Sequence, residues 1–502
     1  MLTYSFTDTE GLSLYEYIYK CIKEDIITGK LTANEKLPSK RVFAKNHGIS
    51  TVTVENAYGQ LMAEGYIYSE PKKGFFVSPI ENYIEDTIIK EPYKPESSSN
   101  TQNSHGSQNI GRDLADSSSF YNYNSDDQHP VIDFISSKTP ADNFPFATWS
   151  KIMRQTLGEQ EEKLLSKPSA GGVWPLREAI ARHLHDFRGI SVHPEQIIVG
   201  AGTEYLYGLI VQLLGRDKTY GLENPCSNKI RNIYQSLDVK TMPIEMDDEG
   251  ILPEQEGLKK SDVIQISPSH HFPTGVVTSI SRRYAILGWA NESGDRYIIE
   301  DDYDSEFRFT GKPILPLLCA SKNENVIYIN SFSKTLSPSF RISYMVLPKK
   351  LSEKFNSKFN FCSCTVNSFE QYALADFIKE EHYSKHIIRM KNYYRNLRNE
   401  LIFKIENSEL KNFVKIHEEN SGLHFLISIN SKFSGKTLEM RLKKNGIKIS
   451  ALKDFFYELE DFSIFSEYSK SFPIDKTFVI NYSGIEKQKI PKTVELILKS
   501  IR

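Results

Sequence analysis

The sequence predicts an α/β protein made of a small N-terminal helical module, a polar linker and a large domain built around a mostly parallel sheet. Three observations support this class. The 502 residues exceed what one hydrophobic core usually covers. From residue 131 onward, helical and strand-like apolar patterns alternate. A stretch rich in Ser, Asn, Asp and Gly separates these alternating patterns from an earlier helical region.

Residues 1–78 predict a winged helix-turn-helix, because two short helices joined by a glycine turn are followed by a hairpin. Before them, apolar residues at steps of three and four predict an amphipathic helix over residues 11–28. The caps, the turn and the wing are expected at Ser39, Gly48, Ser50 and the strand-like runs on either side of Pro71-Lys72-Lys73.

Residues 79–130 are expected to form a flexible linker. The composition shifts to polar residues, with two Ser-Ser-Ser runs and little apolar periodicity. A polar tether of roughly 50 residues spans on the order of 40 Å. Such a linker would let the N-terminal module pack on a partner subunit or reach past it.

Residues 131–502 are expected to form the α/β domain, with a smaller lobe from about residue 365. Alternating strands and helices imply a parallel sheet with helices on both faces. The clearest helices are expected at 176–187, 204–214 and 282–290, and the clearest strands at 196–199, 263–266, 297–299 and 326–329.

Composition excludes several classes of protein. Hydrophobic residues make up 39% and charged residues 25%, with a formal net charge of −2, so bulk charge does not indicate a nucleic-acid partner by itself. The five cysteines lack zinc-site spacing, and we expect reduced thiols and no metal site. No signal peptide and no run of about 18 apolar residues occurs, so we expect a cytoplasmic protein without a membrane partner.

A lysine, an acid and a tyrosine carry the chemistry of the large domain. Lys334 follows Ser331-Phe332-Ser333, and Glu300-Asp301-Asp302-Tyr303 ends an earlier expected strand. Pyridoxal 5'-phosphate (PLP) needs an amine for its Schiff base and a carboxylate for its pyridinium nitrogen. Each motif alone is weak, but the two in this order predict a PLP site.

Three segments carry a resemblance to a known family. They are Pro268-Ser-His-His-Phe-Pro-Thr-Gly275, Ile299-Glu-Asp-Asp-Tyr-Asp-Ser-Glu-Phe-Arg308 and Ser331-Phe-Ser-Lys-Thr-Leu-Ser-Pro338 continuing to Arg341. With the N-terminal module, the chain resembles the MocR family of bacterial regulators, in which a GntR-type winged helix is fused to a fold-type I aminotransferase-like domain. The resemblance spans nearly the whole chain.

The resemblance implies a role for each residue of the PLP site. Lys334 would form the internal aldimine, Asp301 would pair with the pyridinium nitrogen, and Tyr303 would hydrogen-bond the ring hydroxyl. The phosphate would be held by Ser331, Ser333, Arg341 and the backbone N–H groups of Gly202 and Thr203, where a glycine turn opens a helix.

Some positions depart from the family pattern and bear on the ligand. Ser227 stands where an aromatic ring usually stacks on PLP, and Lys167-Pro-Ser-Ala170 replaces a usual Tyr-Gly-Asp-Pro stretch. No arginine occurs between Leu442 and Ile501, where related proteins bind a substrate carboxylate. We therefore expect PLP itself, or PLP joined to an amine without an α-carboxylate, to be the signal, and we assign no catalytic residue.

The resemblance also implies a DNA-reading surface on the N-terminal module. The residues expected to contact an operator are Lys40, Arg41, Ser50, Thr51, Thr53, Lys72, Lys73 and Gly74. Residues 1–80 hold nine Lys or Arg and nine Asp or Glu, so each head should bind DNA modestly. Two heads on one operator, in a homodimer with a head-to-tail arrangement, would supply the affinity.

The most consistent interpretation is a PLP-responsive transcriptional regulator of double-stranded DNA, with vitamin B6 or amine metabolism genes as targets. The main alternative is an active PLP-dependent aminotransferase with a vestigial winged helix. Two others remain: a DNA-binding protein that has lost PLP, and a winged helix used only for protein contacts. The operator, the regulated genes and the sign of regulation do not follow from the sequence.

Overall fold

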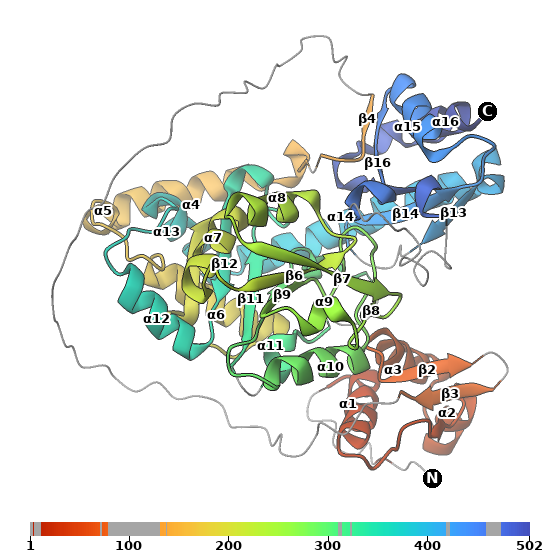
Figure 1. Ribbon diagram of the computed structural model, residues 1–502, viewed down its shortest axis with the longest axis horizontal. Helices are drawn as coiled ribbons and strands as arrows, with labels where there is room; N and C mark the ends of the chain where they lie inside the picture. The colour runs from red at the N-terminus through yellow and green to blue at the C-terminus, as the bar shows by residue number, and fades with distance from the viewer. Residues whose placement is uncertain are drawn as a thin grey trace.

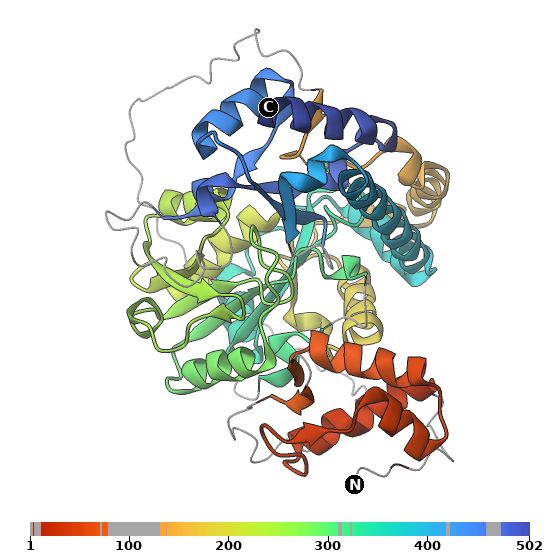
Figure 2. The same ribbon diagram turned by 90° about the vertical axis from the view of Figure 1, so that its right-hand side faces the viewer.

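The computed structural model describes residues 4, 12–70, 73–78, 131–136, 138–309, 314–321, 324–417, 422–457 and 473–502. The linker expected over residues 79–130 and the wing residue Lys72 lie outside these ranges. The chain forms an N-terminal head, a large domain and a small lobe, arranged in that order along the molecule (Figure 2). No helix in the described ranges is both long and apolar enough to cross a membrane.

The head is the predicted winged helix-turn-helix. Ser39 caps α2, and Ser50 caps α3, each by accepting a hydrogen bond from a backbone N–H of the first turn. Gly48 ends α2 in the left-handed conformation. The elements of the head are α1 (Leu14–Ile27), β1 (Lys36–Leu37), α2 (Lys40–His47), α3 (Thr51–Ala63), β2 (Ile67–Glu70) and β3 (Gly74–Val77), and its sheet has the order β1-β3-β2.

The head packs on the large domain beside α10 (Figure 1). The contact is close at Gly65, where a Cβ atom would lie 3.0 Å from the backbone nitrogen of Ile280. The Ile280 side chain packs against the apolar core of the head. A glycine with positive φ therefore lets the turn after α3 approach the first residue of α10.

The large domain is built on an eight-stranded sheet, counted over the described residues, in the order β5-β12-β11-β10-β9-β6-β7-β8. The five central strands β11, β10, β9, β6 and β7 run parallel, and β12 is antiparallel to both of its neighbours. The strands are β5 (Ile197–Ala201), β6 (Thr219–Asn224), β7 (Lys240–Asp247), β8 (Gly250–Ile251), β9 (Val263–Ile266), β10 (Tyr297–Asp301), β11 (Val326–Ser331) and β12 (Ile342–Val346).

Helices cover both faces of this sheet. Alternate residues of a strand point to opposite faces, and in β5 the side chains of Ile197 and Val199 enter one core cluster while Ile198 enters another. The predicted fold class is thus confirmed. The helices are α4 (Phe146–Glu159), α5 (Glu161–Leu164), α6 (Trp174–Arg188), α7 (Thr203–Leu214), α8 (Asn228–Ser236), α9 (Glu256–Lys259), α10 (Ile280–Asn291), α11 (Leu317–Ala320), α12 (Lys349–Phe359) and α13 (Ser368–Lys379).

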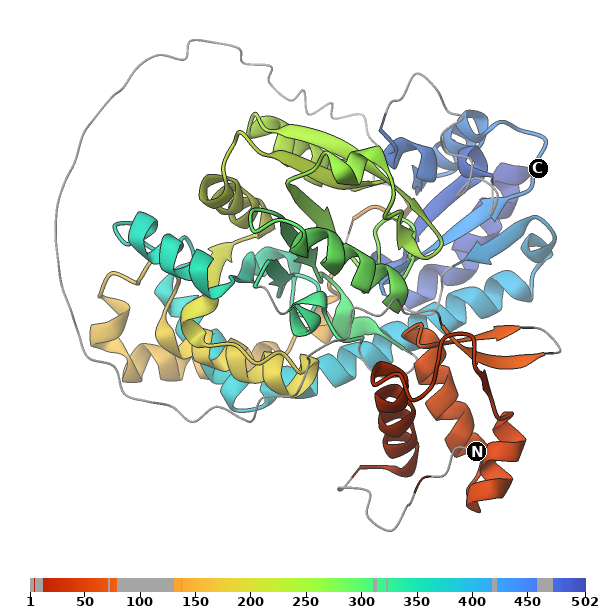
Figure 3. The same cartoon turned by 60° about the horizontal axis from the view of Figure 1, so that its bottom comes forward.

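The small lobe has its own core, and the 25-residue helix α14 joins it to the large domain (Figure 3). The preceding helix α13 packs on α4 and α6 of the large domain, so the core of the lobe begins at α14. A segment from far earlier in the chain, β4, joins the lobe by pairing with β15. The elements are β4 (Ile132–Asp133), α14 (His382–Glu406), β13 (Val414–His417), β14 (His424–Ile429), α15 (Gly435–Lys444), β15 (Ile447–Lys448), β16 (Ser450–Ala451), β17 (Thr477–Asn481) and α16 (Ile490–Ile501).

Candidate functional site

A cavity of about 670 Å³ lies between the large domain and the small lobe. Of the predicted site residues, Lys334, Asp301, Tyr303 and Thr203 line it. Asp301 is the last residue of β10, and Lys334 lies in the turn that follows β11. The carboxyl ends of parallel strands are where ligands bind in open α/β sheets. The structure therefore brings residues of three separate motifs to one cavity.

Asp301 has one carboxylate oxygen occupied and one available. Its Oδ2 accepts a hydrogen bond of 2.6 Å from the hydroxyl of Tyr207, which in turn accepts one from Gln265. Its Oδ1 is buried and has no hydrogen-bond partner within the described residues. Burial raises the pKa of Asp301 to about 6, although the hydrogen bond from Tyr207 acts to lower the pKa. A cationic N–H donor in the cavity would satisfy Oδ1, and a protonated pyridine nitrogen is such a donor.

Lys334 and Tyr303 lie on the wall next to Asp301. Burial lowers the pKa of Lys334, and the charge of Asp304 opposes that shift. A lowered amine pKa makes the lysine a better nucleophile toward an aldehyde. The hydroxyl of Tyr303 lies 3.2 Å from Nδ1 of His270. These groups fit a ring aldehyde with a neighbouring hydroxyl, as in PLP.

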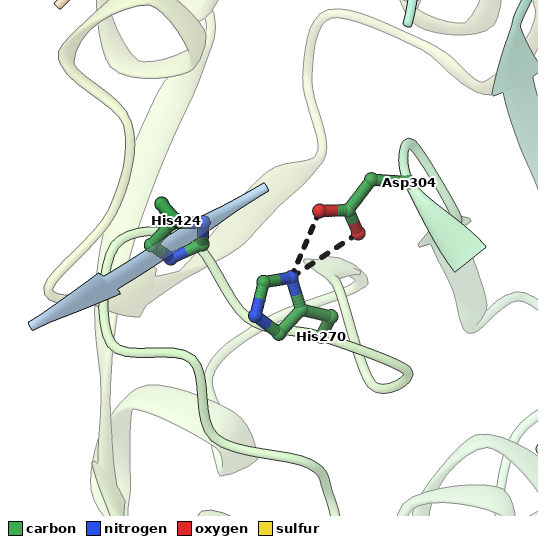
Figure 4. Close-up of side chains that lie close together, drawn as sticks. All are labelled: His270, Asp304 and His424. Atoms are coloured by element: carbon green, nitrogen blue, oxygen red, sulfur yellow. Dashed lines mark hydrogen bonds and ion pairs between the residues drawn. The ribbon is translucent and has the colours of Figure 1, made fainter. Parts of the chain in front are cut away.

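Behind Tyr303, three buried side chains from separate segments come together (Figure 4). His270 Nδ1 lies 2.9 Å from Asp304 Oδ2, and the ring of His424 lies 4.6 Å from that of His270. Two imidazoles and a carboxylate are zinc ligand types. Here, however, the backbone N–H of Leu423 also donates to Asp304. Burial, and then the charges of His270 and Lys334, lower the pKa of His424, and a positive charge on Lys334 also disfavours a metal cation beside it. This surrounding favours a hydrogen-bonded His–Asp pair over a metal centre.

This His–Asp pair also contacts the small lobe. Gly422 has a φ of +70°, and a Cβ there would lie 1.8 Å from Cε1 of His270. The carbonyl of Gly422 accepts a hydrogen bond from the Tyr482 hydroxyl. Only glycine fits this backbone position. The lobe therefore meets the large domain directly behind the candidate cofactor site.

A second buried pair, Glu223 and His271, lines the cavity near Asp301. Glu223 Oε2 lies 3.4 Å from His271 Nε2 and accepts a hydrogen bond from the backbone of Ser267. Burial raises the pKa of Glu223 to about 8 and lowers that of His271 to about 3. Both shifts agree on a pair that is neutral at pH 7, because burial disfavours each charged form.

Of the predicted phosphate-binding residues, Gly202 and Thr203 begin α7 and Arg341 lies close to Gly202, but among the whole set only Thr203 is a described lining residue of the cavity. Ser331 and Ser333 hydrogen-bond each other at 2.9 Å. Arg341, in the left-handed conformation, forms an ion pair of 2.7 Å with Glu204. Gly202 is the N-cap residue of α7 and has a φ of +92°. A helix start, two hydroxyls and a guanidinium are suited to a phosphate group.

Two cavity residues bear on the predicted departures from the family pattern. Asn481, the last residue of β17, lines the cavity, and among the described lining residues there is no arginine. Ser227, the N-cap residue of α8, also lines it. Residues that sequence reasoning missed include Tyr207, Glu223, Gln265, His271, Lys229 and Asn481. The feature of the sequence that could have identified them is their position at or near the end of an expected strand or the start of an expected helix.

The predicted DNA-reading residues lie at the starts of α2 and α3 and on the wing. Arg41 is exposed on the first turn of α2. Lys40 pairs with Glu55 at 2.5 Å, and Lys73 pairs with Glu70 at 2.6 Å. Both pairs are exposed enough for a DNA phosphate to replace the carboxylate at little cost. The remaining predicted residues are Ser50, which caps α3, Thr51 and Thr53 in its first turn, and Gly74 at the start of β3; Lys72 lies outside the described residues.

The apolar side chains of this surface were not predicted. Val52, in the first turn of α3, is 62% exposed, and Val42, in α2, is 50% exposed. In the major groove, an apolar side chain can contact the methyl group of thymine. Both valines therefore add candidates for sequence reading at the same helix starts.

The two parts of the chain match two known families. Residues 14–77 match bacterial regulatory proteins of the gntR family, and residues 132–440 match aminotransferase class I and II. The chain is 34% identical to the HTH-type transcriptional regulator YdeL of Bacillus subtilis, covering 88% of this chain and 89% of YdeL.

Two further relatives share the same architecture. The probable rhizopine catabolism regulatory protein MocR of Rhizobium meliloti is 27% identical, covering 97% of this chain and 93% of MocR. The HTH-type pyridoxine biosynthesis transcriptional regulator PdxR of Corynebacterium glutamicum is 26% identical, covering 89% and 90%.

Among solved structures, the multiple substrate aminotransferase of Thermococcus profundus has a TM-score of 0.63 and 23% identity, covering 74% of this chain and 92% of that one. This likeness establishes the fold of the large domain. The predicted family resemblance is confirmed: the chain belongs to the MocR family of HTH-type transcriptional regulators, in which a GntR-type head precedes an aminotransferase-like domain.

Proposed function

We propose that this regulator binds PLP in the cavity and that PLP, or a PLP–amine adduct, is its effector. The observation that carries the proposal is the Oδ1 of Asp301, which is buried and has no hydrogen-bond partner among the residues that the structure describes; Asp301 lines the same cavity as Lys334 and Tyr303. A buried acceptor without a partner costs free energy, which a ligand with a matching donor recovers. When bound, PLP supplies an aldehyde that exchanges one amine for another.

Each residue has one task toward this ligand. Lys334 offers the amine that holds the cofactor, Asp301 accepts from the ring nitrogen, and Tyr303 orients the ring hydroxyl. Ser331, Ser333, Arg341 and the N–H groups at the start of α7, beside Gly202 and Thr203, hold the phosphate. The pair of Glu223 and His271 is neutral at pH 7, so neither residue competes with Asp301 as the ionic partner of the ring nitrogen.

The effector amine is proposed to lack an α-carboxylate. Asn481 occupies the wall of the small lobe, and its side chain oxygen accepts hydrogen bonds from the backbone and hydroxyl of Ser483. An amide held in this way offers no positive charge to a carboxylate, whereas arginine binds one bidentately. The rest of that wall includes Phe134, Ile135, Phe455 and Val479, which suits an apolar amine.

This specificity can be tested by a gain of function. In Asn481→Arg, an α-amino acid should bind to the PLP-loaded protein and change its visible spectrum, while the wild type should respond only to amines without a carboxylate. Asn392→Arg, on the exposed side of α14, is the matched control for an added positive charge. Tight binding of an α-amino acid to the wild type in calorimetry would contradict the proposal.

We further propose that the protein acts as a homodimer on operator DNA in the cytoplasm, with each head docked on the partner's large domain. The close contact of Gly65 with Ile280 within one chain supports this docking, because the same two surfaces can meet between subunits. Ligand binding would favour one placement of the two heads, and only one placement fits the spacing of two half-sites. Genes of vitamin B6 or amine metabolism are the proposed targets, in keeping with the name of the relative PdxR.

An active aminotransferase is the second candidate, because Lys334, Asp301 and Tyr303 line one cavity as such chemistry requires. One assay distinguishes an aminotransferase from a regulator that only binds PLP. The PLP-loaded protein is mixed with a panel of amino donors and with a 2-oxo acid that accepts the amino group, and formation of the oxo product of each donor is measured. Sustained turnover would favour the enzyme, and stoichiometric binding without turnover would favour the regulator.

The cofactor proposal itself is tested by absorbance. Wild-type protein mixed with PLP should develop the visible band of a PLP–lysine imine, and borohydride should fix the cofactor to the chain at Lys334. Lys334→Ala should show neither result. Lys350→Ala, exposed on α12, should behave as the wild type. Absence of the band in the wild type would refute PLP binding.

A further inference from the structure

A negative charge lies at the place where the phosphate of the cofactor is expected. The carboxylate of Glu204 pairs with Arg341 Nη2 at 2.7 Å through Oε2 and with Lys229 Nζ at 2.5 Å through Oε1. Partial burial acts to raise the pKa of Glu204, but hydrogen bonds from Lys229, its own backbone N–H and Arg341 lower it to about 2. Glu204 is therefore ionised at every physiological pH.

The geometry around Gly202 places this carboxylate in the anion site itself. A Cβ on Gly202 would lie 2.3 Å from Arg341 Nη2 and 2.6 Å from Glu204 Oε2. Both charged groups therefore fold over the N-cap residue of the 12-residue helix α7. The backbone N–H groups of such a helix start attract anions. The carboxylate of Glu204 therefore holds the guanidinium of Arg341, one of the groups expected to hold the phosphate.

The extent of the cavity agrees with this arrangement. Lys229 and Thr203 line the cavity, whereas Glu204, which pairs with Lys229, and Arg341 do not. A ligand that extends from Lys334 toward the start of α7 reaches this ion pair next. Its phosphate must then take Arg341 and Lys229 from Glu204.

We infer that Glu204 is an internal competitor for the cofactor phosphate and sets how tightly the protein holds PLP. The inference rests on the proposed function. Phosphate binding exchanges one anion for another, and the displaced carboxylate still repels the phosphate across a short distance. The affinity is lower than the same site would have without the acid. A sensor gains from this, because it reports changes in ligand concentration only near its dissociation constant, whereas an enzyme gains from permanent loading.

The test is Glu204→Gln, which keeps the shape of the side chain and removes its charge. PLP is titrated into wild type and variant, and the visible band is followed. Because the variant frees Arg341 and Lys229 for the phosphate and removes a repelling charge, it should bind PLP roughly tenfold more tightly, which is about 1.4 kcal/mol. Inorganic phosphate should also compete with PLP more strongly in the variant. Glu353→Gln, exposed on α12, makes the same change in net charge and should have no effect.

The possible failures are distinguishable. Equal or weaker PLP binding by Glu204→Gln, with a normal band in the wild type, would overturn the competitor role and leave the cofactor site standing. If neither protein binds PLP, the proposed function falls and this inference falls with it. A tighter variant cannot be explained by misfolding, since a damaged site loses affinity.

Discussion

The hydroxyl of Tyr207 lies 2.6 Å from Oδ2 of Asp301, and it leaves Oδ1 of the same carboxylate buried without a partner among the described residues. The two residues come from α7 and β10, 94 positions apart in the chain. Tyr207 thus fixes the carboxylate in one orientation and directs its second oxygen at the cavity. A carboxylate held in this way is preorganised for a cationic ring nitrogen.

Replacing Asp301 by Asn should weaken PLP binding. The amide keeps the shape of the side chain but removes the negative charge that keeps the ring nitrogen protonated. A hydrogen bond to a charged group contributes about 1.5–3 kcal/mol, so the dissociation constant should rise roughly 10- to 100-fold. Absorbance titration measures it, and Asp295→Asn in an exposed turn is the control. Unchanged affinity would show that Asp301 does not contact the cofactor.

The stability of the protein should depend on the pH through Glu223. Its folded-state pKa, raised by burial to about 8, lies above the ordinary value of 4.5. The folded state then binds more protons than the unfolded state, so this residue makes stability fall as the pH rises from about 4.5 to 8. In Glu223→Gln that loss is absent.

The difference in melting temperature, Glu223→Gln minus wild type, should therefore become more positive between pH 5 and pH 8. Differential scanning fluorimetry over this range measures it, with the same buffer ions at each pH. The lowered pKa of His271 makes the stability of the folded protein rise with pH below about 6.5. His271 is present in both proteins, so this effect cancels when the variant is compared with the wild type. A constant difference would mean that Glu223 is ionised in the folded protein throughout.

Gly422→Ala should be strongly destabilising. An added methyl group would overlap the ring of His270, and alanine would have to adopt a φ of +70°. Overpacking and left-handed backbone together cost about 2–5 kcal/mol. Gly294→Ala is the matched control, because a Cβ there has no heavy atom within 4 Å. Denaturant unfolding gives both values, and similar values would contradict the close contact between the lobe and the His–Asp pair.

Arg41→Ala should remove specific DNA binding and leave the cofactor spectrum unchanged. A base-contacting arginine contributes about 1–3 kcal/mol per head, and the two heads of a dimer both lose it. Fluorescence anisotropy with specific and scrambled DNA measures the change as a function of salt. Lys499→Ala, exposed on α16, should have no effect. Loss of both the spectrum and DNA binding would point to a folding defect instead.

Much of the fold was predictable because its signals are local. Ser39 and Ser50 cap their helices as expected, and the apolar runs that form β9, β10 and β11 bring Asp301 and Ser331 to one edge of the sheet. Lys334 follows Ser331 by three residues, so its place on the same edge also follows from the chain.

Other parts of the site could not be predicted, because their partners are distant in sequence. The ion pair of Glu204 with Arg341 joins residues 137 positions apart. His270 and Asp304 follow two strands of the large domain, whereas His424 begins β14, so its place beside them depends on how the small lobe packs on the large domain. Likewise, no local signal assigns β4 to the lobe, because its partner β15 lies far later in the chain.

The most direct test of the account is the affinity of the purified protein for the DNA upstream of its own gene as PLP is titrated, measured by fluorescence anisotropy for wild type and Lys334→Ala. The account predicts an affinity that shifts with PLP in the wild type and stays constant in the variant. An affinity that ignores PLP in both proteins, while the wild type shows the visible PLP band, would contradict PLP as the effector.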